Sequence, residues 1–360
     1  MTCATPIRHP VRHPRRHPGP LAAIALVALL AACAGPAPQV PPPPPPIAAV
    51  VPPVSLSPRV VEQASAYRAY VTHASGISAA FADGGGVAQA VRTGSAYEPK
   101  QLLRGAIAYG AVAALQDAAF VAGVRKFVSD PDQRRTIAYE IMKDPAYAVG
   151  FSGSAGAAGR VVAALADDGQ RLLDTGRSVK QAAYDVQHAA WSKADVQDRE
   201  TRLALAKQLS ATATLGELAE TARLQRAVTG GAPFGQATQT LSTPYPPVVV
   251  RSLAVAALAA LGYADDASLA QVMPMLSEVN SAQCLNMSKL NLYQCLAVSK
   301  PHYEDVFCVG QHILMDTGRC LMKGAGVIDS LDAKALAVAQ AAALIPASAP
   351  TPARSRSKKR

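Results

Sequence analysis

Four cysteines near the C-terminus carry the clearest chemistry in this sequence. They are Cys284, Cys295, Cys308 and Cys320. Because His302 and His312 lie among them, a zinc site is one interpretation, but structural zinc sites usually contain closely spaced pairs such as Cys-x2-Cys. Here ten, twelve and eleven residues separate successive cysteines. Clustered cysteines in even number are typical of disulfides in exported proteins. We therefore predict two disulfides and assign no metal ligand.

The spacing also indicates how these cysteines pair. Residues 299–302 have the composition of a turn, and the two cysteines before the turn mirror the two after it. In an antiparallel helical hairpin, residues equally far from the turn lie opposite each other. This predicts the nested bridges Cys284–Cys320 and Cys295–Cys308, with pairing inside each helix as the alternative. The arrangement is similar in its spacing to the twin Cys-x9-Cys helical hairpins of mitochondria.

Nested pairing places one demand on the second helix of this hairpin. At 100° per residue, Cys284 and Cys295 fall within about 20° of one another on their helix. The twelve-residue step from Cys308 to Cys320 separates these two residues by about 120°. We therefore expect an irregularity between them, at Gly310 or at the pair Thr317-Gly318.

The N-terminus has the features of a secretory signal. Residues 1–20 contain four arginines and no acidic residue, and an apolar run of twelve residues follows, from Leu21 to Ala32. This run is shorter than the roughly 20 residues that cross a bilayer. Its end, Leu30-Ala31-Ala32-Cys33, resembles the lipobox of bacterial lipoproteins. The resemblance implies that Cys33 becomes the lipidated (palmitate-bearing) first residue of the mature chain. It also implies a periplasmic protein anchored in the outer membrane, since Ala34 replaces the aspartate of inner-membrane retention.

The net charge of +10 does not describe the body of the protein. Four positive charges lie in the signal and five in the tail Arg354–Arg360, and without these nine the chain has 26 basic and 25 acidic residues. A nucleic-acid-binding surface needs a basic excess, so no nucleic-acid partner is expected. The expected partner is the lipid membrane, through acylated Cys33. The tail is a candidate contact for an envelope protein or an anionic surface.

No catalytic motif is found in the sequence. G-x-S-x-G, H-E-x-x-H and S-x-x-K with S-D-N are all missing. Cys308 and His312 are one helical turn apart and would form a thiolate–imidazolium pair only if the cysteine were free. The acidic pair Asp167-Asp168 is typical of a cap or a solvated turn. We therefore assign no catalytic residue and no cofactor, and we do not expect an enzyme.

Alanine and leucine dominate the body, aromatic residues make up 5%, and alternating β-branched runs are missing, which predicts an all-α fold. Residues 160–191 carry a heptad pattern with one large and one small residue per repeat. The large positions are Leu165, Leu172, Val179 and Val186. The small side is Val162, Gly169, Gly176, Ala183 and Ala190. Glycine at these positions predicts close antiparallel packing, in which neighbouring helices hold a helix that glycine weakens.

Glycine and proline clusters divide the chain. We predict a signal peptide at 1–32, the lipidated cysteine and a Pro-rich linker at 33–58, a helical domain at 59–230, a connector at 231–247, a helical subdomain with the four cysteines at 248–328, and a short helix with a disordered basic tail at 329–360. Ser57-Pro58 and Asp130-Pro131 are expected helix starts, and the glycines at 84–86 an expected helix end. Residues 98–128 are expected to form one helical stretch, and the apolar residues 248–261 a buried core helix.

Three functions agree with these features. The first is a membrane-anchored periplasmic lipoprotein of structural or interaction type that binds another cell-envelope component. The second is an envelope enzyme, such as a peptidoglycan-acting hydrolase, with a site assembled from distant residues. The third is a carrier of an apolar ligand. A deep polar cleft with converging ionisable groups would favour the enzyme, and a sizeable apolar cavity would favour the carrier.

Replacement of the lipobox cysteine tests the anchor. Cys33→Ala should abolish incorporation of labelled palmitate and leave the signal unprocessed, because the thiol is the atom that is acylated. Gel mobility and fractionation of cells measure both effects. Unchanged labelling and mobility in this variant would exclude Cys33 as the anchor.

Overall fold

The computed structural model describes residues 51–231, 240–329 and 333–334. The signal peptide, Cys33 and the tail Arg354–Arg360 lie outside these residues, so the predictions about them stand as predictions. The described residues contain fourteen α-helices and no sheet, with one isolated bridge between Asp195 and Pro301, which confirms the all-α fold.

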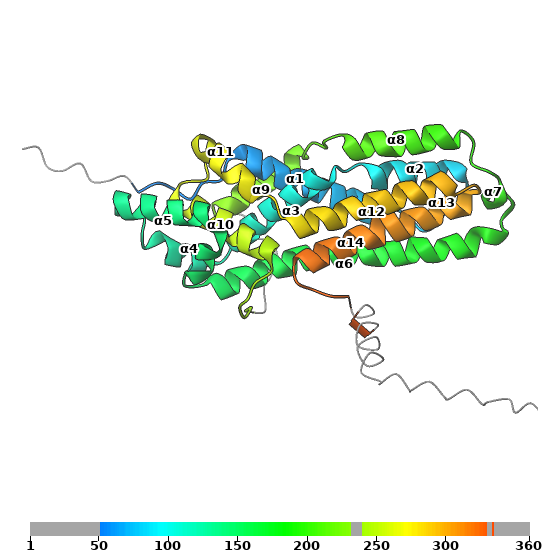
Figure 1. The fold of residues 1–360 in the computed structure, drawn as a ribbon. Helices are drawn as coiled ribbons and strands as arrows, with labels where there is room; N and C mark the ends of the chain where they lie inside the picture. The colour runs from blue at the N-terminus through cyan, green and yellow to red at the C-terminus, as the bar shows by residue number, and fades with distance from the viewer. Residues whose placement is uncertain (1–50, 232–239, 330–332, 335–360) are drawn as a thin grey trace, which may run out of the picture. The chain divides into compact units, whose positions relative to one another are not determined.

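The helices (Figure 1) are α1 Pro58–Ser75, α2 Gly84–Ser95, α3 Pro99–Ala114, α4 Ala118–Arg125, α5 Pro131–Lys143, α6 Ser154–Asp185, α7 Ala190–Lys193, α8 Arg199–Ala211, α9 Leu218–Val228, α10 Pro247–Leu261, α11 Leu269–Val272, α12 Val279–Val298, α13 His302–Cys308 and α14 Asp316–Gly324. A π-helical segment, Val309–Met315, joins α13 to α14.

Side-chain caps mark the starts of six of the fourteen α-helices. Ser57 accepts from the Arg59 backbone N–H, and Asp130 caps α5, as predicted from the sequence. The expected helix end at residues 84–86 is wrong, because the Asp83 carboxylate accepts from the Gly86 N–H and starts α2 there. The single stretch expected over residues 98–128 is interrupted, since Asp117 caps a second helix, α4.

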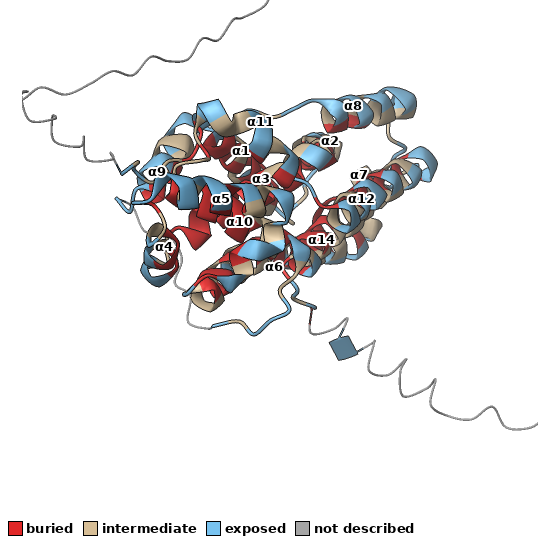
Figure 2. Ribbon diagram, turned by 60° about the vertical axis from the view of Figure 1, so that its left-hand side comes forward, coloured by how far each residue is buried: buried red, intermediate tan, exposed pale blue. Residues whose placement is uncertain are grey.

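Helix α10 occupies the centre of the hydrophobic core. It is apolar around almost its whole circumference, and Leu253 to Leu261 are all fully buried (Figure 2), as predicted for this segment. It packs against α3, α4, α5 and α6. Helices from both sides of the predicted connector at residues 231–247 contribute to one hydrophobic core. In the sequence its members extend from Leu56 to Ala325.

Glycines bring α6 into backbone contact with the π-helical segment and α14. A Cβ atom added to Gly176 would lie 2.8 Å from the backbone nitrogen of Met315 and 2.9 Å from the carbonyl oxygen of Gly310. One added to Gly318 would lie 2.6 Å from the carbonyl oxygen of Gly169. The close antiparallel packing predicted from the heptad pattern is therefore confirmed, although α6 ends at Asp185, before Val186 and Ala190.

The disulfides are nested as predicted. Cys284 pairs with Cys320 and Cys295 with Cys308, with Cα–Cα distances of 5.7 and 5.8 Å. The expected irregularity is the π-helical segment, which contains Gly310. A π-bulge accommodates one extra residue, so the twelve-residue step turns about as far as eleven residues of regular helix, which leaves about 20° between the two cysteines.

The expectation for Asp168 is wrong. This residue is neither a cap nor solvated: it lies inside α6, is 1% exposed, and its carboxylate contacts the guanidinium groups of Arg68 and Arg171. Arg68 also lies 5.2 Å from the centre of the Tyr109 ring. A buried carboxylate is retained where cations pair with it, and here α1 supplies the cation that the local sequence does not reveal.

Helix α8 is attached largely by polar contacts. Only Ala206 and Ser210 of this helix are buried. Arg199 donates from Nε to the Ser299 carbonyl at 2.8 Å, and Arg202 binds both oxygens of Asp305 at 2.6 and 2.7 Å. Carbonyls at the C-terminus of α12 are thus satisfied by arginine side chains. At the same end, the single tryptophan, Trp191, lies 6.4 Å from the His302 ring, centre to centre.

A methyl group at the glycine contact tests the close packing. Gly176→Ala should lower the free energy of unfolding by about 1–3 kcal/mol, because backbone atoms of the neighbouring helix must move. Gly86→Ala is the matched control: its added Cβ meets no atom nearer than 3.8 Å. It should raise stability by up to about 1 kcal/mol, through helix propensity. Denaturant titration measures both, and equal effects would contradict the close contact.

Candidate functional site

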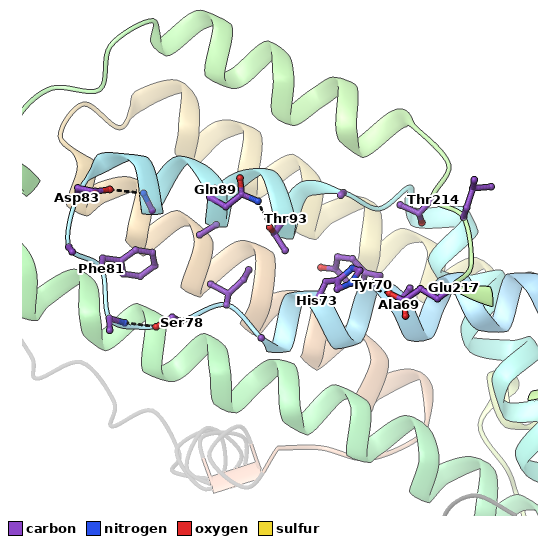
Figure 3. A pocket seen from close by; sticks show the side chains of 18 residues that line it. Ala69, Tyr70, His73, Ser78, Phe81, Asp83, Gln89, Thr93, Thr214 and Glu217 are labelled. Carbon is purple, nitrogen blue, oxygen red and sulfur yellow. Dashed lines mark hydrogen bonds and ion pairs between the residues drawn. The ribbon is translucent and has the colours of Figure 1, made fainter. Parts of the chain in front are cut away.

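A groove of about 770 Å³ lies between α1 and α2 and is the candidate functional site (Figure 3). We call it the α1–α2 groove. Its walls come from the C-terminal half of α1, the connection 76–83, one face of α2 and the segment 214–217 that precedes α9. Its volume falls within the range of about 300–1,000 Å³ that is typical of small-molecule sites.

The groove follows from small residues on two facing helices. Ala69 on α1 and Ala90 on α2 line it, and their short side chains leave space between the helix axes. Phe81 and Ile77 from the connection 76–83 supply larger apolar walls and are only partly buried. Leu215 at the opposite wall is 79% exposed. A concave surface of this kind offers apolar area to a ligand or a partner.

The acidic groups and the histidine of the groove lie along its edge. His73 Nε2 is 3.1 Å from Glu217 Oε1, which links α1 to the segment before α9. Asp83 Oδ1 accepts from the Gly86 N–H at 2.8 Å. Among the described residues that line the groove, none is lysine or arginine. The groove therefore suits an apolar body with a neutral or cationic end rather than an anion, which would be desolvated without a positive partner.

Burial keeps the tyrosine of the groove uncharged. The Tyr70 hydroxyl donates to the Gly94 carbonyl at 3.3 Å, and burial raises the pKa of Tyr70 well above its ordinary value. The ring of Tyr70 lies 4.5 Å from that of Tyr97, centre to centre. The inner wall of the groove is thus a fixed, neutral aromatic surface.

The histidines of the described residues and the cysteines singled out in the sequence do not gather at one site. His73 lines the α1–α2 groove, whereas His188 and His302 line other hollows. His312 Nδ1 lies 2.8 Å from Asp316 Oδ2. Cys308 is bonded to Cys295, so it has no thiol to pair with His312. Cys33 lies outside the described residues.

A buried lysine is the ionisable group that sequence reasoning missed. Lys289 on α12 is 4% exposed, and its ammonium group donates to the Ser95 carbonyl at 2.8 Å and to Ser210 Oγ at 3.0 Å. It also lies 3.4 Å from the centre of the Tyr97 ring. Burial lowers the pKa of Lys289 well below its ordinary value. The sequence did contain one indication of this burial, because Lys289 is the single charged residue in an otherwise uncharged helix, α12.

The contact between Lys289 and Ser210 has the atom types of a nucleophile and its base. Ser210 is also 4% exposed, and its hydroxyl lies close to the Ala206 carbonyl at 2.7 Å and the Ser95 carbonyl at 3.1 Å. Since the pair is closed off from solvent and one member sits on α8, the arrangement favours a structural role, the attachment of α8 to α12.

Comparison with known protein families, with curated proteins and with solved structures finds no match. Among the described helices, none alone is both long and apolar enough to cross a membrane; α3 and α4 reach this length together but bend by 86°. Within the described part of the chain, no group of three or more histidine, cysteine or acidic residues is arranged to hold a metal ion.

Removal of the buried ammonium group should change how stability depends on pH. Because the folded state lowers the pKa of Lys289, the unfolded chain binds more protons between that lowered pKa and pH 10.5, and stability rises with pH across this window. Lys289→Met should flatten this rise between about pH 7 and 9, where most unfolded tyrosines are still protonated. Urea titrations at several pH values measure the two slopes, and identical slopes would refute the assignment.

Proposed function

We propose that this chain is a lipid-anchored protein of the cell envelope, of interaction type, whose helical body binds another envelope component in the α1–α2 groove. The lipobox ending in Cys33 supports the anchor on the periplasmic face of the outer membrane. The Pro-rich linker that follows is suited to a spacer, because proline-rich chains are extended. The missing catalytic motifs favour binding over catalysis.

The observation that carries this proposal is the apolar wall of the groove. Phe81 and Leu215 expose apolar side chains on opposite walls, and Leu218, just beyond, is 91% exposed. Covering such surface is favourable by about 25 cal/mol per Å². A binding partner that enters the groove gains this free energy, while a free surface of this kind has no stabilising role in the fold.

The charges at the edge define the partner further. Glu217 and Asp83 are the acidic groups, and each already has one partner, the His73 ring or a backbone N–H. A partner with an apolar segment that ends in a neutral amide, a hydroxyl or an ammonium group meets no like charge here. A bare phosphate or carboxylate would meet two carboxylates.

The volume of the groove favours a second candidate, a carrier of an apolar small molecule. A cavity of about 770 Å³ with largely apolar walls is of the size that encloses such ligands. Both functions use the same walls. They differ in whether a protein or a lipid-like molecule is recovered with the chain.

Site-specific photo-crosslinking in intact cells tests the groove. A benzoyl-phenylalanine in place of Phe81 or Leu215 should capture a discrete partner, because both side chains contact whatever enters the groove. The same residue in place of Tyr139, which is 61% exposed on α5, is the matched control and should capture none. Mass spectrometry of the product separates a protein partner from a lipid-like ligand.

A second variant fills the groove without removing the exposed side chains. Thr93→Phe on α2 should reduce capture at Leu215 at least fivefold, whereas Thr136→Phe on α5 should leave it unchanged. Capture that is equal at Phe81 and Tyr139, or that is insensitive to Thr93→Phe, would contradict a binding role for the groove.

A further inference from the structure

The solvent-facing side of α12 has no charged residue. Of its twenty residues, only Lys289 is ionisable at neutral pH, and this side chain is buried. Surface helices usually present charged residues to water, whereas the centres of protein interfaces are depleted of charge and enriched in methionine. Four apolar side chains lie on the exposed side: Val279, Met287, Leu290 and Val298.

The exposed residues of α12 are symmetric about the midpoint between Ser288 and Lys289. Val279 and Val298 lie equally far from it and are 80% and 75% exposed. Met287 and Leu290 are the inner pair and are 46% and 45% exposed. Four of the five amide residues follow the same rule, since Gln283 mirrors Gln294 and Asn286 mirrors Asn291; the fifth, Asn280, mirrors Ala297.

This symmetry is what an antiparallel pair of identical helices requires. In a two-fold symmetric interface the same patch faces itself, and in antiparallel helices residues equally far from the centre lie opposite each other. We propose that α12 is a self-association surface, on which a second copy of this chain packs its own α12 in the antiparallel direction. Valine then meets valine, methionine meets leucine, and four of the five amides meet an amide, while Asn280 meets Ala297.

The spacing of the exposed residues fits such a contact. Two rows of positions recur every three or four residues, which is the period of a seam between two packed helices. One row is 279, 283, 286, 290, 294 and 297, and the other is its mirror, 280, 283, 287, 291, 294 and 298. Amide side chains both donate and accept hydrogen bonds, so glutamine opposite glutamine leaves no group unpaired. A partner helix with charged residues at these positions would instead bury charge against neutral groups.

The flanks of α12 add to the contact. Hollows of about 470 and 410 Å³ adjoin the helix, and Met287 lines both. The disulfides fix α14 beside the N-terminal half of α12 and α13 beside its C-terminal half. Antiparallel pairing about a two-fold axis therefore brings Lys323 of one copy to the flank that carries Glu304 in the other.

The surface area that the two copies can bury limits how tightly they are expected to associate. A helix of twenty residues is about 30 Å long and 10–12 Å wide, so the seam alone offers roughly 300–360 Å² per copy. A standard interface buries about 800 Å² per partner, which the seam reaches only with its flanks. At this size we expect a weak, transient dimer. Anchoring of both copies on one membrane, which rests on the proposed function, would raise their effective concentration.

Cysteine crosslinking tests the register directly. Val279→Cys and Val298→Cys, in differently tagged full-length chains expressed together, should form a mixed disulfide dimer under mild oxidation. Val279→Cys alone should not, since its two copies would be nearly 20 residues, or about 28 Å, apart along the seam. Tyr139→Cys on α5 controls for random collision. No mixed dimer, as much dimer from Val279→Cys alone, or linkage to a different protein would each overturn the proposal.

Charge substitution at the centre provides the energetic test. Leu290→Glu should weaken dimerisation of the purified full-length chain in detergent at least tenfold, measured by sedimentation. Met287→Lys added to it should restore most of the loss, because each glutamate then faces a lysine of the other copy. An unchanged melting temperature shows that the fold is intact. Dimerisation that is insensitive to Leu290→Glu, or not restored in the double variant, would refute this seam.

Discussion

The rest of the structure depends on one constraint, the close contact of backbones in the core. Helix α6 lies on one side of this contact, and the π-helical segment and α14 lie on the other. Gly169 and Gly176 on one side, and Gly310 and Gly318 on the other, leave no room for a side chain. Each glycine costs up to about 1 kcal/mol of helix propensity relative to alanine. Close packing of long helices, with many dispersion contacts, offsets this cost. The disulfides then join α12 to the same unit.

The opposite side of the body is held by different forces. Helix α8 buries two residues and depends on Arg199, Arg202 and the contact between Ser210 and Lys289. Polar attachments of this kind open at lower free energy than an apolar core does. The molecule thus combines a rigid layer of α6, α12 and α14 with the more weakly attached helix α8. The segment that follows α8 lines the α1–α2 groove.

Local chemistry made much of the fold predictable from sequence. Caps with proline located α1 and α5, the heptad pattern located the glycine contact, and the mirrored cysteines gave the bridges and the need for an irregular helix. These features depend on residues within a few turns of each other or on one simple hairpin. The glycines at 84–86 led to the wrong prediction of a helix end, because the cap at Asp83 outweighs their low helix propensity and starts α2 there.

The groove and the buried charges could not be predicted in this way. Asp168 is paired with Arg68, 100 residues earlier in the chain, and Lys289 is hydrogen-bonded to uncharged groups 79 and 194 residues away. The walls of the groove likewise come from two separate stretches, 69–96 and 214–217. A pattern along one helix reports which face is buried but not which distant side chain meets it.

One aromatic side chain has a practical consequence. Trp191 is the only tryptophan, and it belongs to α7 and lies next to His302, the first residue of α13. The α1–α2 groove has no indole of its own. Tryptophan emission, excited at wavelengths where the eleven tyrosines do not absorb, is therefore a local optical probe of the α7–α13 end, and it is separate from the signal of a dye placed in the groove.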